Sequence, residues 1–265
     1  MKVKIIHDSN EVFEFIKTRI RYDYMYQFNN LDEREWPNTI CYGLYDGAIL
    51  KEMAMIYTAY DIPVLLAASF EGNEHNKRLL KTIKAYLPPK FYTHIDEKTL
   101  KEVFDGDDIS DYHEYVNMGI SDFSKIDDLD RKNTVRLGYA EINRIKTLFE
   151  EGYPDNWVDD SLIKLTDNYG VEIKDKLISF AGIHAYSIKH QVAAIAHVTT
   201  HPDYRSRGYA RDSIVALIKD LREKVQYIGL NVKVKNHPAI NCYKNIEFQE
   251  YGRFIACVIT NSKVI

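Results

Sequence analysis

The residues best suited to chemistry lie in one short stretch of the second half of the chain. Residues 198–210 read Val-Thr-Thr-His-Pro-Asp-Tyr-Arg-Ser-Arg-Gly-Tyr-Ala, at the point where a predicted strand ends and a long predicted helix begins. The start of a helix presents backbone N–H groups without partners in the helix, together with the positive end of the helix dipole. Gly208 can adopt backbone angles that are closed to most residues, and Arg205, Arg207 and Arg211 add positive charge. The stretch therefore predicts a site for an anionic group such as a pyrophosphate.

The spacing in this stretch is more specific than the residue types, because an ordinary strand-to-helix turn can also contain Gly-x-Ala and surface arginines. Arg-x-x-Gly-x-Ala over 205–210, following Thr-His-Pro-x-Tyr, resembles the acetyl-coenzyme A (acetyl-CoA) signature of the GNAT superfamily of N-acetyltransferases. A second motif over 230–243, Leu-x-Val-x-x-x-Asn-x-x-Ala-x-x-x-Tyr, is similar to the next strand and helix of that superfamily. The stretch is neither a Walker loop, which ends in Gly-Lys-Ser/Thr, nor a Rossmann fingerprint, which has three glycines.

The resemblance covers residues 135–258 and implies an α/β fold, in which a mixed, strongly twisted sheet is flanked by helices. It implies that the strands over 192–199 and 227–234 splay apart to admit the pantetheine arm, which would bond the main chain of Val198 and Thr200. Backbone amides over 205–211 would hold the pyrophosphate, and Asn236 would contact the cofactor near its thioester. The cofactor-binding residues that the resemblance implies are Val198, Thr199, Thr200, Arg205, Ser206, Arg207, Gly208, Tyr209, Ala210, Arg211 and Asn236.

The same resemblance implies that the Tyr243 hydroxyl serves the departing thiolate. Ala239 and Tyr243 are four residues apart, so they share one face of a predicted helix. Acyl transfer to an amine needs a donor for the departing sulfur and a route for the amine proton. Since the chain has 20 tyrosines, packing in the core is the alternative role for Tyr243. Within the motif, the sequence favours Tyr243 as the catalytic residue.

The general base is not evident from the sequence. Many superfamily members carry Glu on the strand before the pyrophosphate loop, whereas residues 193–199 here read Ala-Ala-Ile-Ala-His-Val-Thr. His197 is the one titratable residue on that strand, and an imidazole suits proton transfer at neutral pH. A structural role for His197, a water chain, and His184 as a weaker candidate stay open. Glu247 is a second departure, because the family usually has Gly before the Phe, and it puts the turn geometry in doubt.

The site depends on elements that hydrophobic periodicity predicts around it. Apolar spacing predicts a helix over 140–150 and a long amphipathic helix over 210–225, and Pro154 opens another, carrying Trp157, Val158, Leu162, Ile163 and Leu165. Residues 171–173 and 177–186 form a predicted hairpin around a polar turn, and 248–260 has room for two strands. The polar, acidic segment 121–133 is typical of a linker.

The first half has a similar order of predicted elements but lacks the signature. A helix is expected over 12–20, a hairpin with an Asp-Gly turn near 46–47, and a strand–helix–strand order over 62–94. The segment after the strand over 62–68 holds Glu71 and Glu74, which would repel a pyrophosphate. We expect a degenerate GNAT-like domain over 1–120 and an acetyl-CoA-binding domain over 134–265, in a tandem similar to glycine N-acyltransferase-like proteins. Packing, shaping of the acceptor cleft and formation of a homodimer are the roles left open for the first half.

Composition limits the remaining function classes. The chain has 265 residues and a formal net charge of −4, which argues against a nucleic-acid partner. The three cysteines, Cys41, Cys242 and Cys257, are too widely spaced for a disulfide framework or a CxxC metal pair, and the nine histidines show no metal-ligand spacing. The first residues lack the apolar stretch of a signal peptide, and no apolar stretch is long enough to span a bilayer. We therefore expect a cytoplasmic protein without a metal site or a membrane partner.

The leading hypothesis is an acetyl-CoA-dependent N-acetyltransferase that transfers an acetyl group directly to an amine in a ternary complex. A non-catalytic acyl-CoA-binding module is the alternative, which the missing strand carboxylate favours, and a purely structural protein is a third. The acceptor, a small-molecule or peptide amine, cannot be read from the sequence. The aromatic stretch over 22–28 is expected to pack under a loop rather than to line an acceptor pocket.

Overall fold

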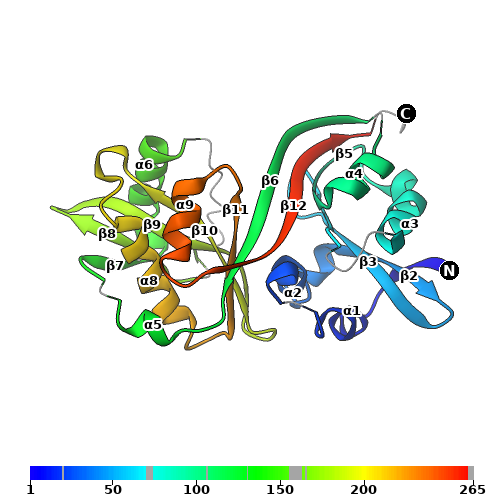
Figure 1. Ribbon diagram of the computed structural model, residues 1–265, viewed down its shortest axis with the longest axis horizontal. Helices are drawn as coiled ribbons and strands as arrows, with labels where there is room; N and C mark the ends of the chain where they lie inside the picture. The colour runs from blue at the N-terminus through cyan, green and yellow to red at the C-terminus, as the bar shows by residue number, and fades with distance from the viewer. Residues whose placement is uncertain are drawn as a thin grey trace. The chain divides into compact units, whose positions relative to one another are not determined.

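The computed structural model of the protein describes residues 1–19, 21–69, 74–105, 107–129, 131–154, 163–164 and 166–261. They form two compact units (Figure 1). The first unit comprises Met1–Asn117, Lys233–Lys235 and Tyr251–Ile265, and the second comprises Met118–Val232 and Asn236–Glu250. The units are thus interleaved along the sequence, whereas the expected boundaries at 1–120, 121–133 and 134–265 treat the domains as consecutive segments.

The first unit is built on a mixed sheet with the strand order β1-β2-β3-β4-β5-β12-β6. Strands β1 to β4 pair antiparallel, β4 and β5 pair parallel, and β12 pairs antiparallel with β5. The Asp-Gly turn joins β2 to β3 as predicted, with Gly47 in the left-handed region at φ +61°. The strands are β1 (Lys2–Ile6), β2 (Thr39–Asp46), β3 (Ile49–Tyr57), β4 (Val64–Ala67), β5 (Lys90–Ile95), β6 (Asp108–Ile120) and β12 (Gln249–Thr260).

Four α-helices accompany this sheet: α1 (Ser9–Ile16), α2 (Met25–Asn30), α3 (Glu74–Ile83) and α4 (Glu97–Val103). Aspartate side chains cap α1 and α4, since Asp8 accepts from Asn10 N and Asp96 accepts from Thr99 N. Within the aromatic stretch over 22–28, Tyr22, Tyr24, Met25 and Phe28 are buried. The prediction that this stretch packs rather than lines a pocket agrees with that burial.

The C-terminal part of the described chain corrects one prediction. Residues 249–260 form a single strand, β12, where two strands were expected after Phe248. Strand β12 pairs with β5 from Ile255 opposite Ile95 to Thr260 opposite Lys90, and three of its side chains enter the core of the first unit. Those side chains are Ile255, Cys257 and Ile259. Apolar alternation identified the strand, but it carries no information about which sheet the strand joins.

The second unit has a mixed sheet with the strand order β11-β10-β9-β8-β7. Neighbours pair antiparallel except β10 and β11, which are parallel. The predicted hairpin is present as β8 and β9, with Lys174 and Asp175 at positive φ in its turn. The strands are β7 (Thr134–Leu137), β8 (Asn168–Ile173), β9 (Lys176–Ser187), β10 (Val192–Thr200) and β11 (Tyr227–Lys233).

Helices cover both faces of this second sheet. Phe180 packs with α6 (Ile142–Gly152), while the next residue back along β9, Ser179, bonds Ser213 of α8 (Tyr209–Leu221). Because adjacent residues of a strand point to opposite faces, α6 and α8 lie on opposite sides of the sheet. Helix α9 (His237–Lys244) follows β11. Each unit therefore has the mixed sheet flanked by helices that the sequence predicts.

The segment expected to be a linker is structured instead. Residues Ser124–Asp127 form helix α5, and Ile126 on it is fully buried. Lys219 of α8 donates to the carbonyl oxygens of Asp127 and Leu129 at 3.1 and 3.0 Å, and Arg222 pairs with the Asp127 carboxylate at 2.7 Å. One apolar residue among polar ones gives no periodicity, so the sequence pattern could not show this packing.

Two further observations complete the fold. The helix expected after Pro154 falls on residues outside the described part of the chain, apart from Ile163, which is buried. None of the described helices is long and apolar enough to cross a membrane.

Candidate functional site

The parallel pair β10–β11 opens before β10 ends. Its ladder runs from Val192 opposite Tyr227 to Ile195 opposite Leu230, and β10 then continues to Thr200 without further register to β11 among the described residues. The backbone of His201 donates to Ile178 O of β9 at 2.9 Å. Since successive peptide groups of a strand alternate in direction, the Thr200 peptide group faces away from β9. The structure thus leaves an open strand edge where the sequence predicts that the two strands splay.

Two bulges interrupt the pairing of β9 with β10 at this point. One falls at His184 of β9, because Ala194 is opposite Ala185 and Ile195 is opposite Ile183. The other falls on β10 between Ala196, opposite Gly182, and Thr199, opposite Phe180. His197 and Val198 there lie opposite the single residue Ala181 of β9, and His197 has φ +56°. Bulges re-aim side chains and increase twist, and they are frequent beside active sites.

The turn after β10 presents backbone amides to one place. Residues Pro202–Tyr204 form a 3-10 turn, Ser206 and Gly208 have φ +61° and +86°, and α8 begins at Tyr209. The first intrahelical bond is Asp212 N to Gly208 O at 3.0 Å, so the amides of Tyr209, Ala210 and Arg211 precede the helical ladder. A Cβ added to Gly208 would meet nothing within 4 Å. Gly208 is therefore required for its left-handed backbone and not for lack of space.

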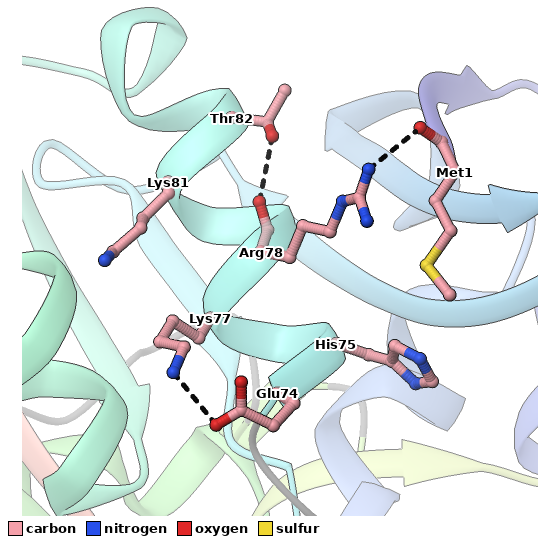
Figure 2. A pocket seen from close by; sticks show the side chains of 7 residues that line it. All are labelled: Met1, Glu74, His75, Lys77, Arg78, Lys81 and Thr82. Atoms are coloured by element: carbon pink, nitrogen blue, oxygen red, sulfur yellow. Dashed lines mark hydrogen bonds and ion pairs between the residues drawn. The ribbon is translucent and has the colours of Figure 1, made fainter.

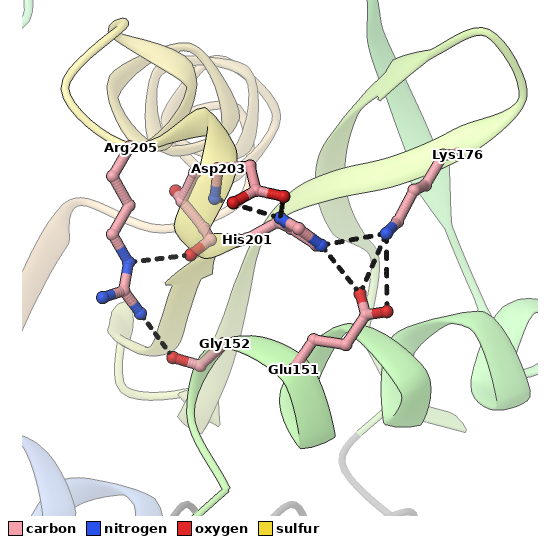
Figure 3. Close-up of polar contacts among 7 residues, drawn as sticks. Glu151, Gly152, Lys176, His201, Asp203 and Arg205 are labelled. Atoms are coloured by element: carbon pink, nitrogen blue, oxygen red, sulfur yellow. Dashed lines mark hydrogen bonds and ion pairs between the residues drawn. The ribbon is translucent and has the colours of Figure 1, made fainter.

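The three arginines of the motif do different things. Arg205 donates from Nε to Thr200 O at 3.2 Å and from an η-nitrogen to Gly152 O at 2.7 Å (Figure 3). Arg211 pairs with Asp212 at 3.0 Å, and Arg207 lies 5.6 Å from the centre of the Tyr204 ring. The sequence placed all three around a pyrophosphate. In the structure, Arg205 links the turn to the end of α6, because its guanidinium donates to the backbone carbonyl oxygens of Thr200 and Gly152.

A second connection to α6 involves His201, which the sequence assigned only to the loop. His201 Nδ1 accepts from Asp203 N at 3.2 Å, and its Nε2 lies 3.2 Å from Glu151 Oε2 and 2.9 Å from Lys176 Nζ (Figure 3). Lys176 also pairs with Glu151 at 3.1 Å. Sequence reasoning missed Glu151 and Lys176, because they are far from the motif in the chain and nothing in their local pattern distinguishes them from surface residues.

Buried hydroxyl groups join β9, β10 and α8 beneath the turn. Ser179 Oγ donates to Thr199 O at 3.1 Å and lies 3.2 Å from Thr200 Oγ1, and Ser213 Oγ donates to Ser179 Oγ at 3.1 Å. Ser179 and Ser213 are completely buried. They hold the first turn of α8 against the end of β10. The sequence did carry a signal for them, namely a serine inside an apolar strand and another on the apolar face of a helix.

Tyr243 is buried on α9, with its ring 5.9 Å from that of Phe248. Burial, and to a smaller extent the neighbouring Cys242 and Tyr153, raises the pKa of the Tyr243 phenol far above its ordinary value. A phenol in this environment keeps its proton and can donate its O–H to an acceptor. Tyr153, at the end of α6, was not identified from the sequence as a neighbour of this hydroxyl.

Two further residues from the sequence analysis, Asn236 and Glu247, have structural roles next to α9, the helix that carries Tyr243. Asn236 caps α9, since its Oδ1 accepts from Ala239 N at 3.3 Å. Glu247 adopts φ +71°, the left-handed conformation for which a glycine would be suited, and its carboxylate pairs with Lys125 at 3.0 Å. The substitution of Glu for Gly therefore keeps the turn, and the carboxylate is bound to a lysine.

The corresponding crossover of the first unit, β4–α3–β5, is closed where β10–α8–β11 is open. Strand β4 pairs with β5 along its whole length, from Val64 opposite Tyr92 to Ala67 opposite Ile95. The buried Asn76 of α3 then donates to Ala67 O at 2.6 Å and to Asp96 Oδ2 at 3.3 Å. Glu71, which was expected to repel a pyrophosphate, lies outside the described residues.

A surface pocket of about 530 Å³ lies on the outer face of α3 (Figure 2). Two of its cations are already engaged, because Lys77 pairs with Glu74 and Glu102 at 2.9 Å each, and Arg78 donates to Met1 O at 3.4 Å. The described residues that line it include neither an amide-lined turn nor an open strand edge. We therefore take the end of β10, and not this pocket, as the candidate site. Among the described residues no group of three His, Cys, Asp or Glu side chains is arranged to hold a metal ion.

Comparison with known proteins finds a family match in the second unit. Residues 140–248 match the family model described as the acetyltransferase (GNAT) family, and this span includes β10, the Gly208 turn and α9. No match was found among curated proteins. The second unit thus carries a GNAT acetyltransferase domain.

Similar solved structures span both units. A putative GNAT-family acetyltransferase from Novosphingobium aromaticivorans is 18% identical, with 89% of this chain and 96% of that chain covered at a TM-score of 0.61. A Drosophila protein is 11% identical, covering 98% and 99% at a TM-score of 0.72. A tandem GNAT protein from the clavulanic acid biosynthesis pathway is 9% identical, covering 97% and 98% at a TM-score of 0.56. At these identities the likeness establishes the fold.

Proposed function

We propose that this protein, which carries a GNAT acetyltransferase domain at residues 140–248, transfers the acetyl group of acetyl-CoA directly to an amine. The observation that carries the proposal is the continuity of two features. The open edge of β10 runs directly into the amide-lined turn at Gly208. A substrate that joins an amide-containing arm to a pyrophosphate matches this order of groups along the backbone.

The binding assignments follow from those two features. The outward-facing peptide group of Thr200, with Val198 in the bulge before it, supplies strand-type hydrogen bonds to the pantetheine amides. The amides from Ser206 to Arg211 take the pyrophosphate, favoured by the positive end of α8. Thr199 has an indirect role, because its carbonyl oxygen accepts from the Ser179 hydroxyl and so holds the end of β10 in position.

The chemistry is displacement at a thioester carbonyl. The neutral amine attacks the carbonyl carbon, a C–N bond forms, and the C–S bond breaks. The Tyr243 O–H gives its proton to the departing thiolate, and the proton that the amine nitrogen loses as the amide forms restores the phenol by way of solvent. Burial suits this role, because it keeps the phenol protonated and strengthens a hydrogen bond to a developing negative charge.

The test of binding uses Gly208→Glu, with Gly47→Glu as its matched control. Both glycines have positive φ and open space around a Cβ, but Gly47 lies in a hairpin turn of the first unit. We expect both variants to lose about 1 kcal/mol of stability from backbone strain. By calorimetry, Gly208→Glu should lose acetyl-CoA binding, and Gly47→Glu should bind as the wild type does. Wild-type affinity in Gly208→Glu would show that the site is misplaced.

The test of activity is an amine screen with detection of the released thiol, followed by Tyr243→Phe. We expect turnover with at least one amine class and a loss of about 10²-fold in kcat for Tyr243→Phe, with acetyl-CoA affinity unchanged. Equal turnover at saturating substrate would remove Tyr243 as the proton donor.

A second function is favoured by one observation. Strands β9, β10 and β11 and helix α9 contain no Asp or Glu. A protein that only senses or holds acyl-CoA needs no proton acceptor there. Tight acetyl-CoA binding without thiol release across a broad set of amines would support this alternative.

A further inference from the structure

A transferase at this site needs a group that removes a proton from the acceptor, since an amine with an ordinary pKa arrives as an ammonium ion. The strands and the helix around the opening of β10 provide no carboxylate. Two carboxylates on the nearby helices are engaged elsewhere. Glu151 of α6 pairs with Lys176 and lies beside His201, and Asp212 of α8 pairs with Arg211. The side chains on β9 and β10 that carry an imidazole, the group whose ordinary pKa lies nearest to neutral pH, are His184 and His197.

Both histidines sit at the irregularities of the sheet. His184 is the extra residue in the bulge of β9, and His197 is in the bulge of β10. His197 comes two residues after Ile195, where the pairing with β11 stops. Its φ of +56° is a conformation that residues with a Cβ rarely adopt and that costs of the order of 1 kcal/mol. Regular pairing would avoid this strain, and it would also turn the His197 side chain to the other face of the sheet.

The two imidazoles are in contact. Their ring centres are 5.9 Å apart with an interplanar angle of 63°, and the ring of Phe149 on α6 lies 6.4 Å from His197 at 78°. Edge-to-face contacts on the His197 ring from His184 and Phe149 restrict its rotation. His197 is thereby held at a defined orientation on the face of the sheet that α6 covers.

We propose that His197 is the general base of the reaction and that His184 is a positioning residue, which holds the His197 imidazole by its ring. The inference rests on the proposed acetyltransferase function. His197 takes one proton from the acceptor ammonium, directly or through one water. The freed lone pair forms the C–N bond, the C–S electron pair leaves with sulfur, and Tyr243 protonates that sulfur. The nitrogen, which became positively charged on forming the C–N bond, gives up its second proton, and that proton restores the Tyr243 phenol by way of solvent. The imidazolium returns its own proton to solvent, which leaves no net change at either side chain.

The first experiment measures kcat/KM against pH from 5.5 to 9.5, with an amine found by the screen, for the wild type and for His197→Asn. Asparagine is chosen because it tolerates positive φ better than other non-glycine residues. We expect His197→Asn to lose 10²- to 10³-fold at pH 6.5. The loss should shrink at high pH, because the amine then arrives already deprotonated. Calorimetry should show unchanged acetyl-CoA affinity, which separates a lost base from a misfolded site.

Two further variants separate chemistry from packing. Imidazole added to the buffer should restore part of the rate of His197→Gly, a result that a merely structural role would not give. His184→Phe keeps a ring without nitrogen, so it should stay within about threefold of the wild type, whereas His184→Ala should lose about tenfold in kcat. His113→Gln, at a half-exposed position on β6, is the control and should leave the profile unchanged.

The outcomes distinguish the two levels of the hypothesis. If the wild type binds acetyl-CoA and acetylates no amine, the proposed function fails, and the general base falls with it. If the wild type acetylates an amine and His197→Asn keeps the same rate and profile, only the assignment of His197 is wrong. If His184→Phe is as impaired as His184→Ala, the His184 nitrogen takes part in proton transfer and the positioning role is overturned.

Discussion

The two parallel crossovers of the molecule, β4–α3–β5 and β10–α8–β11, share a topology and differ at one end. In the first unit, β5 pairs with β4 to its last residue, and Asn76 bonds the final carbonyl, Ala67 O. In the second unit, β11 leaves β10 after Ile195, and β10 continues to an amide-lined turn. On the proposed function, we therefore expect acetyl-CoA binding to need more than the strand–helix–strand topology. We expect it to need a strand edge that the neighbouring strand leaves unpaired.

The largest effect expected from this comparison concerns the closed end of the first crossover, where Asn76 bonds the last carbonyl of β4. Asn76→Ala leaves Ala67 O and Asp96 Oδ2 without their buried donor, so the free energy of unfolding should fall by about 3 kcal/mol. Acetyl-CoA affinity should not change. Denaturant titration and calorimetry measure the two quantities, with the exposed His75→Ala on the same helix as the control. A change in acetyl-CoA affinity would show that the closed end takes part in binding.

The next prediction compares a buried aspartate from each unit. Oδ1 of Asp23 is buried without a hydrogen-bond partner among the described residues, and burial raises the pKa of Asp23 to about 6. Burial also raises the pKa of Asp212, but Arg211 and the backbone N–H of Lys132 oppose that shift. A raised carboxyl pKa means that the folded state binds the proton more tightly than the unfolded state. Stability is therefore lost as pH rises from about 4 to 6, and it stays low above that range.

The measurement is unfolding free energy at pH 4 and pH 7.5. Asp23→Asn should gain up to about 3 kcal/mol at pH 7.5 and nothing at pH 4, since two pKa units correspond to about 3 kcal/mol. Asp212→Asn should gain less at pH 7.5. Equal gains at both pH values for Asp23→Asn would mean that a cause other than ionisation stabilises the variant.

A smaller effect should distinguish Arg205 from Arg207, the two arginines in the turn that follows the open edge of β10. Arg205→Ala removes the bonds to Thr200 O and Gly152 O, so acetyl-CoA affinity should fall about tenfold, equivalent to about 1.4 kcal/mol, with little dependence on salt. Arg207→Ala should lose a few-fold, and that loss should shrink at 0.5 M salt because only screened charge is removed. Calorimetry at two salt concentrations tests the distinction. If the loss in Arg205→Ala shrinks at 0.5 M salt and the loss in Arg207→Ala does not, the phosphate contact belongs to Arg205.

The smallest effect concerns the hydroxyl groups beneath the turn. Ser213→Ala removes the donor to Ser179 Oγ and should cost about 1 kcal/mol of stability with a two- to threefold rise in the KM for acetyl-CoA. Thr82→Ala on α3, where the hydroxyl only returns to the helix backbone at Arg78 O, should cost less than half as much. Similar losses would mean that the buried network adds nothing specific to the open end.

Local features of the site could be predicted from sequence, and long-range ones could not. The Gly208 turn, the long helix after it and the hairpin β8–β9 depend on residues that are adjacent in the chain. Glu151, Lys176 and His201 meet only because α6, β9 and the turn converge. The bulges at His184 and His197 depend on register between two strands, and the periodicity of either strand alone does not specify register. For the same reason, nothing in the sequence indicates that β12 pairs with β5.

The pairing of β12 with β5 also has a consequence for the order of events during synthesis. Thr93 of β5 and Cys257 of β12 are paired, yet the whole of the second unit is translated between them. While the ribosome makes that segment, the first unit lacks Ile255, Cys257 and Ile259 from its core, and one edge of β5 stays uncovered. The second unit, whose binding turn is contiguous in sequence, can form before the first unit is complete. The first unit, although it begins the chain, therefore completes its fold last. Its uncovered β5 edge is open to aggregation during that interval.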